Sequence, residues 1–340
     1  MSHSVVIGGA GFVGSWVVEE ILKDPEARVT IVDNLLSSER WNVSKNARVN
    51  FIERSASEEN TFQQITDQVN YVYQLACFHG NQNSIVQPIE DFENGLKTTL
   101  MTLEWIKTKH PLARMIYSSA GCAVAEKTWE EPKATTEINS TSLLQDSPYS
   151  ISKIAGEMYS LVYHKLHGID IVRVRFQNVF GPREILGAGK WRGTDATLWR
   201  NVVPVFIYKS IKGLPLEVNP RASRDFIFVE DIAKGVVMAA KNGTSGDVYN
   251  LASGQETKIS DLAKLVTSYT NSTSPIFEEE PRSWDTSGRR FADIIKSRTE
   301  LNFNPQYSLE QGLKITVDWT QKNIAQIEVS IGKHTNRKSI

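Results

Sequence analysis

Apolar positions in the first third of the chain alternate between a strand-like and a helix-like spacing. A β-rich run at residues 5–7 precedes an apolar pattern of helical period over 12–21, and a second β-rich run ends at Asp33. The same alternation predicts strands near 48–52, 71–75 and 115–118, a helix through 62–65 and a long helix over about 90–109. This order predicts an α/β fold in which a doubly wound parallel sheet has both faces covered by helices.

The pattern continues past a polar loop at 121–146. Ser147 and Pro148 are typical of a helix start, and Gly168 marks the expected end of that helix. Further strands are expected at 169–176, 226–228 and 248–251, and further helices at 203–212, at 230–241, from 260, and twice more before the C-terminus. The rhythm changes after Gly181, which predicts a second lobe. We expect one domain over 1–180 plus about 226–252, and a smaller α+β domain over about 181–225 plus 253–330.

The turn after the first strand is rich in glycine. Gly9, Gly11 and Gly14 fit G-x-G-x-x-G, whereas Gly8, Gly11 and Gly14 fit the wider G-x-x-G-x-x-G spacing. Either spacing lets backbone N–H groups at a helix N-terminus approach a pyrophosphate. Asp33 lies about 20 residues beyond Gly14, where an acid accepts a hydrogen bond from the ribose 2′-hydroxyl and repels a 2′-phosphate. This arrangement predicts a dinucleotide-binding Rossmann domain with NAD, rather than NADP, as cofactor.

Composition excludes several classes of partner. The 340 residues carry 38 basic and 39 acidic side chains, so no general field draws the chain to nucleic acid or to an anionic membrane. The absence of a leader-like start and of an 18-residue apolar run predicts a cytosolic, soluble protein. Cys77 and Cys122 are too few for a disulfide framework and lack metal-ligand spacing, so we expect reduced thiols and no metal site.

Tyr149 and Lys153 are the leading candidates for chemistry. Four residues apart on the expected helix, they share one face, so the ammonium group can lie near the phenol. A neighbouring cation lowers the pKa of a phenol, and the positive nicotinamide ring of NAD⁺ would add to that effect. We therefore expect Tyr149 to act as a base near neutral pH.

Several segments in order resemble the extended short-chain dehydrogenase/reductases, in particular the NAD-dependent nucleotide-sugar epimerases and dehydratases. The chain is most similar to the bacterial O-antigen group within that family. The segments are GGAGFVG at 8–14, VDNL at 32–35, YQLA at 73–76, YSSAGC at 117–122, SPYSISK at 147–153, FQNVFGP at 176–182 and RDFIFVED at 224–231.

The resemblance implies oxidation of a sugar carbon, usually C4, by hydride transfer to bound NAD⁺, with Tyr149 taking the hydroxyl proton. Lys153 would bind the nicotinamide ribose and keep Tyr149 ionised. Cofactor contacts are implied for Gly8, Gly11, Phe12, Val13, Gly14, Asp33, Asn34, Leu35, Leu75, Ala76, Asn94, Ser118, Tyr149, Lys153, Phe176 and Val179. Contacts to the diphosphate of a nucleotide sugar, with a UDP-sugar favoured, are implied for Asn178, Asn201, Arg224 and Arg282.

The third catalytic position departs from the family. Its Ser/Thr falls on Ala120, which leaves Ser119 as the candidate hydroxyl, with Ser118 beside it. Family dehydratases carry an Asp-Glu pair where this chain has Gly121 and Cys122, which argues against a 4,6-dehydratase of that type.

Three functions follow from these residues. The leading interpretation is a 4-epimerase that acts through a transient ketone. The alternatives are a dehydratase or a C3/C5 epimerase that uses Cys122, and a non-catalytic NAD-binding sensor. The family also implies a homodimer formed through the helices over 90–109 and 148–167.

Overall fold

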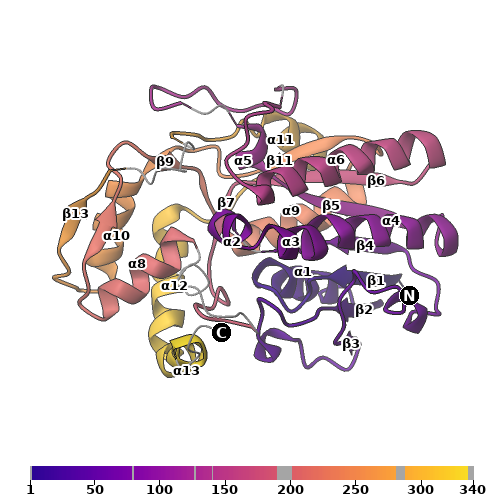
Figure 1. Cartoon of the computed structure of the whole chain (residues 1–340), viewed down its shortest axis with the longest axis horizontal. Coiled ribbons are helices and arrows are strands. Elements are labelled where there is room, and N and C mark those ends of the chain that lie inside the picture. Colours follow the sequence, from indigo (N-terminus) through magenta and orange to yellow (C-terminus); the bar gives the residue numbers. More distant parts are fainter. Residues whose placement is uncertain are drawn as a thin grey trace.

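The computed structural model describes residues 2–78, 80–125, 128–139, 141–189, 201–280 and 288–335. Its centre is a seven-stranded sheet in the order β11-β6-β5-β4-β1-β2-β3, with every neighbouring pair parallel (Figure 1). The strands are β1 Ser2–Ile7, β2 Ala27–Val32, β3 Val49–Ile52, β4 Tyr71–Gln74, β5 Arg114–Ala120, β6 Ile171–Phe176 and β11 Val248–Leu251.

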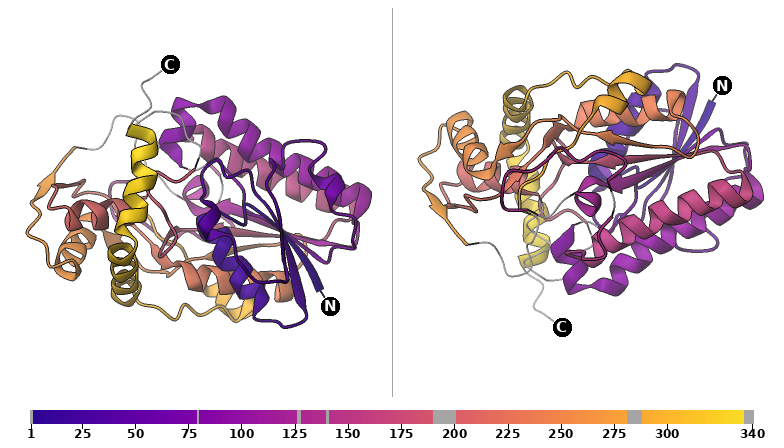
Figure 2. Two further views of the ribbon diagram at one scale, coloured as in Figure 1. Left: turned by 90° about the horizontal axis from the view of Figure 1, so that it is seen from below. Right: turned by 90° about the horizontal axis from the view of Figure 1, so that it is seen from above.

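Helices cover both faces of this sheet, which confirms the predicted doubly wound α/β fold (Figure 2). Helices α1 (Phe12–Leu22) and α9 (Val229–Asn242) pack on one face, and α4 (Thr98–Lys109) and α6 (Pro148–His167) pack on the other. Successive strand residues point to opposite faces, so both faces need apolar side chains. That requirement explains why the strands read as continuous apolar runs.

Helix α6 begins and ends where the sequence predicts. The Ser147 side chain accepts a hydrogen bond from the Ser150 N–H at 3.3 Å, and Pro148 occupies the first turn. Gly168 ends the helix with φ of +66°, a conformation that costs a glycine little. These two signals place Tyr149 in the first helical turn and Lys153 one turn later.

Two helices differ from their predicted form. The segment expected as one long helix is built from α3 (Pro88–Asp91), a π-helical turn at Phe92–Lys97 and α4. The helix expected through 62–65 is a single 3-10 turn, Phe62–Gln64, and the Phe62 ring stacks on the Trp105 ring with centroids 4.7 Å apart.

A second core lies beside the carboxyl ends of the strands (Figure 1). Its elements are α8 (Val202–Ile211), β8 (Leu216–Val218), α10 (Ile259–Tyr269) and α12 (Leu309–Lys322). The exposed strand β13 (Ile276–Glu278) pairs with β8. β7 (Asn178–Phe180) pairs with β10 (Phe226–Phe228), and the side chains of this pair enter both cores. β9 (Ser223–Arg224) pairs with β12 (Thr257–Lys258). Within the described residues 288–335 there are three helices rather than the two predicted: α11 (Ile295–Leu301), α12 and α13 (Ile324–Thr335).

Asp225 ties together segments from distant parts of the chain. Its buried carboxylate accepts hydrogen bonds from the Ser253 N–H and hydroxyl, the Gly254 N–H and the Ala292 N–H, at 2.6 to 3.2 Å. Burial raises the pKa of Asp225, and these hydrogen bonds oppose that shift. The residue is therefore a structural anchor between β9 and β10.

The predicted domain boundaries remain a prediction.

Within the described ranges, no helix combines the length and apolar character needed to cross a bilayer. The same residues contain no group of three or more His, Cys, Asp and Glu side chains placed to hold a metal ion. Neither Cys77 nor Cys122 forms a disulfide.

Candidate active site

A cavity of about 540 Å³ opens at the carboxyl ends of β1, β4, β5 and β6. Strand order reverses between β1 and β4, and open α/β sheets bind ligands at such a switch point. The second core closes the far side of the cavity through residues of α8, β8 and α10. One cavity therefore extends from the glycine turn to the second core.

The glycine turn forms the floor of one half of this cavity. Gly8 has φ of +85°, and a Cβ there would lie 2.7 Å from the Ala76 nitrogen. A Cβ at Gly14 would lie 2.0 Å from the Gly8 carbonyl oxygen. Gly8, Gly11 and Gly14 line the cavity, whereas Gly9 packs against Ile31. The structure thus favours the wider glycine spacing of the two that the sequence left open.

Helix α1 begins at this turn without a side-chain cap. The N–H groups of a first helical turn have no partner within the helix, and they bind anions well. Gly11 has no side chain, and Phe12 and Val13 form the uncapped first turn of α1. The backbone at these residues can therefore accommodate a pyrophosphate.

Asp33 lies at the end of β2 and joins the glycine turn to the loop that follows. Its carboxylate accepts hydrogen bonds from the Ala10 N–H at 3.0 Å, the Leu35 N–H at 2.9 Å and the Ser38 hydroxyl at 2.9 Å. Burial raises the pKa of Asp33, and the three donors offset part of that effect. Asp33 and Asn34 line the cavity, whereas Leu35 is not among the lining residues.

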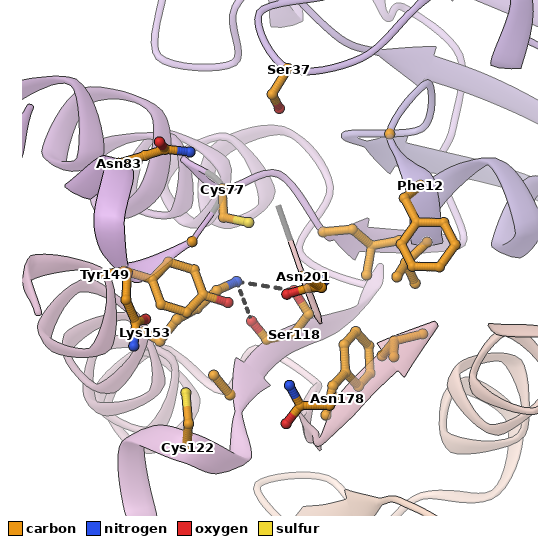
Figure 3. Close-up of a pocket in the computed structure, with 18 of the residues that line it drawn as sticks. Phe12, Ser37, Cys77, Asn83, Ser118, Cys122, Tyr149, Lys153, Asn178 and Asn201 are labelled. Atoms are coloured by element: carbon orange, nitrogen blue, oxygen red, sulfur yellow. Dashed lines mark hydrogen bonds between the residues drawn. The ribbon is translucent and has the colours of Figure 1, made fainter. Parts of the chain in front are cut away.

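Tyr149 and Lys153 meet β5 in the middle of the cavity (Figure 3). The Lys153 ammonium donates to the Ser118 carbonyl at 2.8 Å and contacts the Ser118 hydroxyl at 3.3 Å. It lies 5.9 Å from the centre of the Tyr149 ring. The backbone of Tyr149 is held separately, because its N–H donates to the Ser84 hydroxyl at 3.0 Å. The pair therefore has the shared face that the sequence predicts.

Burial raises the pKa of Tyr149 well above its ordinary value, and the neighbouring Cys77 and Cys122 thiols add to the shift. The sequence argument expected a lowered pKa from Lys153 together with the nicotinamide charge. Lys153 is the cation beside the Tyr149 ring among the described residues, and the nicotinamide charge in that expectation belongs to the cofactor.

Two polar groups that have no hydrogen-bond partner in the described part of the chain lie near Ala120, where the family's hydroxyl is missing. Ser119 is buried in β5, and its hydroxyl has no hydrogen-bond partner among the described residues. Both polar atoms of the Gln177 amide are also unpartnered there, and a Cβ on Gly121 would lie 2.2 Å from the amide nitrogen. Sequence reasoning missed Gln177, although it directly follows β6, which pairs with the end of β5 at Ala120. Unpartnered buried polar groups at a cavity wall are typical of a ligand site.

The predicted substrate residues line the end of the cavity near the second core, with one exception. Asn178, Asn201 and Arg224 are lining residues, and Arg282 lies outside the described residues. The Asn201 amide donates to Glu184 at 2.7 Å. The Arg224 guanidinium donates to the carbonyls of Ser223 and Gly288, which fixes its direction.

Arg290 is the main lining residue that the sequence argument missed. Its side chain is 6% exposed, and its Nε and Nη1 atoms have no partner among the described residues. Its neighbour Arg289 instead forms a two-pronged ion pair with Glu256, at 2.7 and 2.9 Å. A buried guanidinium without a counterion indicates an anion site.

The other predicted cofactor residues also line the cavity, namely Phe12, Val13, Leu75, Ala76, Asn94, Ser118, Phe176 and Val179. Lining residues that the sequence argument did not name include Leu36, Ser37, Ser38, Arg54, Ser55, Ala56, Cys77, Asn83, Val218 and Asn219. The roles of these residues remain predictions.

Comparison with known proteins establishes the family. The model of the NAD dependent epimerase/dehydratase family matches residues 4–252. The chain belongs to this family. It is therefore an NAD-dependent enzyme of the extended short-chain dehydrogenase/reductase type, as the sequence motifs predict.

Individual members of the epimerase/dehydratase family show how wide its chemistry is. The Bordetella bronchiseptica enzyme WbmF, solved in complex with NAD+ and UDP, is 45% identical, with 98% of this chain and 96% of that one covered and a TM-score of 0.87. A putative UDP-glucose 4-epimerase of Methanocaldococcus jannaschii is 27% identical over 94% of this chain and 98% of its own length. A UDP-N-acetyl-alpha-D-glucosaminuronate decarboxylase of Bacillus cytotoxicus is 28% identical over 93% and 96%.

Arg290 gives a direct test of the anion site in this family member. We expect Arg290→Met to weaken UDP binding, measured by calorimetric titration, by at least about tenfold, because a charge-assisted hydrogen bond is lost. NAD content should not change. Arg289→Met is the matched control and should bind UDP as the wild type does. Unchanged UDP affinity in Arg290→Met, or an equal loss in both variants, would contradict this assignment.

Proposed function

We propose that the enzyme is a nucleotide-sugar epimerase that acts at C4 of a UDP-sugar through a transient ketone. The observation that carries this proposal is the position of the Tyr149 and Lys153 pair. It lies in one cavity between an uncapped helix N-terminus and a second end that contains the buried Arg290. Such a position suits a group that serves a dinucleotide on one side and a sugar phosphate on the other.

Each of these residues has a separate role in the proposed reaction. Gly8, Gly11 and Gly14 leave room for the cofactor pyrophosphate at α1, and Asp33 faces its adenosine ribose. Tyr149 removes the proton from the sugar hydroxyl as the ketone forms and returns it when the ketone is reduced. NAD bound beside this pair would supply a reversible hydride acceptor for the same carbon, so the reaction would have no net redox change. Lys153 holds the developing phenolate and, through Ser118, stays fixed to β5.

Charged and amide side chains at the end of the cavity near the second core favour the diphosphate of a nucleotide sugar there. Arginine matches phosphate geometry because its N–H groups form a planar fork. Arg290 is buried with no acidic partner among the described residues, and Asn178, Asn201 and Arg224 line the same cavity. UDP in the WbmF complex supports uridine as the nucleoside.

A C3/C5 epimerase that uses Cys122 is the second candidate. Cys122 lines the cavity and is close enough to Tyr149 to affect its pKa. Gly121 stands where family dehydratases carry an acid, which disfavours a 4,6-dehydratase. A non-catalytic sensor is disfavoured because Tyr149 and Lys153 keep the geometry that catalysis requires.

The proton-transfer role of Tyr149 predicts a dependence on pH. We expect Tyr149→Phe to lower kcat by at least about a thousandfold while NAD stays bound, because general acid–base catalysis is lost. Turnover should rise with pH as the phenol ionises. In Lys153→Met the pKa of Tyr149 rises further, so the rising limb of kcat should move to higher pH. Wild-type turnover by the Tyr149→Phe enzyme would contradict the proposed role of Tyr149 in proton transfer.

Solvent deuterium separates the two epimerase candidates. We expect incubation with UDP-hexoses in D₂O, followed by NMR, to give the C4 epimer with no deuterium at C3 or C5. A Cys122 mechanism exchanges protons with solvent and would place deuterium at those carbons. Cys122→Ser serves as the control and should retain 4-epimerisation. Deuterium at C3 or C5 that disappears in Cys122→Ser would favour the second candidate.

An apolar stripe on α6 supports the predicted homodimer. Ile151, Met158, Val162 and Leu166 follow a helical spacing and are 46 to 73% exposed. Sedimentation velocity should show a dimer for the wild type and a monomer for Val162→Glu. A monomeric wild type at micromolar concentration would contradict this proposal.

A cytoplasmic location remains a prediction from the sequence.

A further inference from the structure

One wall of the cofactor half of the cavity is the loop after β2. Leu36, Ser37 and Ser38 line the cavity, and Ser38 donates to Asp33 at 2.9 Å. Asp33 in turn accepts from the glycine turn at Ala10. The start of the loop is therefore fixed to the floor of the site.

Glu39 fixes the next part of this loop to the C-terminal helix. One carboxylate oxygen, Oε1, accepts from three donors: the Gly189 N–H at 3.3 Å, the Ser330 hydroxyl at 3.3 Å and the Lys333 ammonium at 2.9 Å. Ser330 and Lys333 lie on α13, and Gly189 lies in the segment that follows β7. Three segments far apart in the sequence thus meet at one atom.

The segment at 183–189 is packed tightly between the loop and α13. A Cβ on Gly189 would lie 2.1 Å from the Leu36 carbonyl oxygen, and a Cβ on Gly187 would lie 2.7 Å from the Ile331 Cα. Both glycines have positive φ, at +96° and +67°. Ile185, Leu186 and Ala188 form a small buried core with Ile327 of α13. Movement of the loop therefore requires movement of this segment and of the helix.

Aromatic and polar contacts extend the attachment beyond Glu39. Trp41 stacks on Trp319 of α12 with ring centres 6.1 Å apart, and the Asn42 amide donates to the Arg183 carbonyl at 3.2 Å. The cavity wall at 36–38 is consequently held on both sides, by Asp33 before it and by contacts to the second core and α13 after it.

We propose that Glu39 and α13 form a latch that positions the wall at Leu36–Ser38 and retains the bound NAD. Glu39 does not line the cavity, so it is a positioning residue that acts through the loop. This inference rests on the proposed assignment of this half of the cavity to the cofactor. A latch suits a reaction in which the hydride returns to the sugar, because the cofactor then never needs to leave between turnovers.

The exchange rate of bound NAD in the full-length enzyme tests the latch. Enzyme loaded with labelled NAD⁺ is diluted into excess unlabelled NAD⁺, and retained label is followed on a desalting column. We expect Glu39→Ala to exchange about tenfold faster than the wild type, because three hydrogen bonds to one carboxylate are lost. Lys333→Ala removes one exposed partner and should exchange about two- to threefold faster. Glu39→Gln keeps an acceptor oxygen and should exchange at an intermediate rate.

Glu328→Ala is the matched control, because Glu328 lies on the same helix but pairs with Lys212 rather than with the loop. It should exchange as the wild type does, and all four variants should unfold within a few degrees of the wild type when saturated with NAD. Wild-type exchange in both Glu39→Ala and Lys333→Ala would overturn the latch, as would equal acceleration in Glu328→Ala. If the wild type binds NAD, the assignment of this half of the cavity to the cofactor stands whether or not the latch does. A wild type that binds no NAD would overturn both the assignment and the latch.

Discussion

The absence of side chains at Gly8 and Gly14 is the constraint on which the rest of the site depends. A methyl group at either position would enter the backbone of a neighbouring segment, at 2.7 Å from Ala76 or 2.0 Å from Gly8. Without it, β1, β4 and α1 meet closely enough for the first turn of α1 to face a cavity. That contact places the cavity at the switch point, and parallel pairing then brings the ends of β5 and β6 to the same edge.

The catalytic pair depends on a second, electrostatic constraint. Lys153 is buried with its ammonium committed to Ser118, and Tyr149 is buried in surroundings that raise its pKa. A lower pKa of the Tyr149 phenol needs positive charge close to it, and the proposed mechanism assigns that charge to Lys153 and to the bound cofactor together.

Local sequence signals predicted the parts of this structure that local physics determines. Ser147, Pro148 and Gly168 set the ends of α6, and the apolar strands set the sheet. The sequence left the two glycine spacings open, because only tertiary contacts distinguish them. Gly8 lines the cavity beside Leu75 and Ala76, whereas Gly9 packs against Ile31. Gln177, Arg290 and Glu39 were missed for a related reason. The role of each of these residues depends on which residues lie next to it in the folded chain, or on the lack of a partner there. Periodicity and motifs in the sequence do not predict such contacts. The π-helical turn after Asp91 likewise depends on packing of α3 and α4 against α6.

The proposed 4-epimerisation requires that one sugar carbon lose its hydrogen as hydride and receive the same hydrogen back. A UDP-hexose deuterated at C4 and turned over in ordinary water, with the label in the product located by NMR, tests this requirement. The epimerised product should retain deuterium at C4. Loss of that deuterium to solvent during epimerisation would rule the mechanism out.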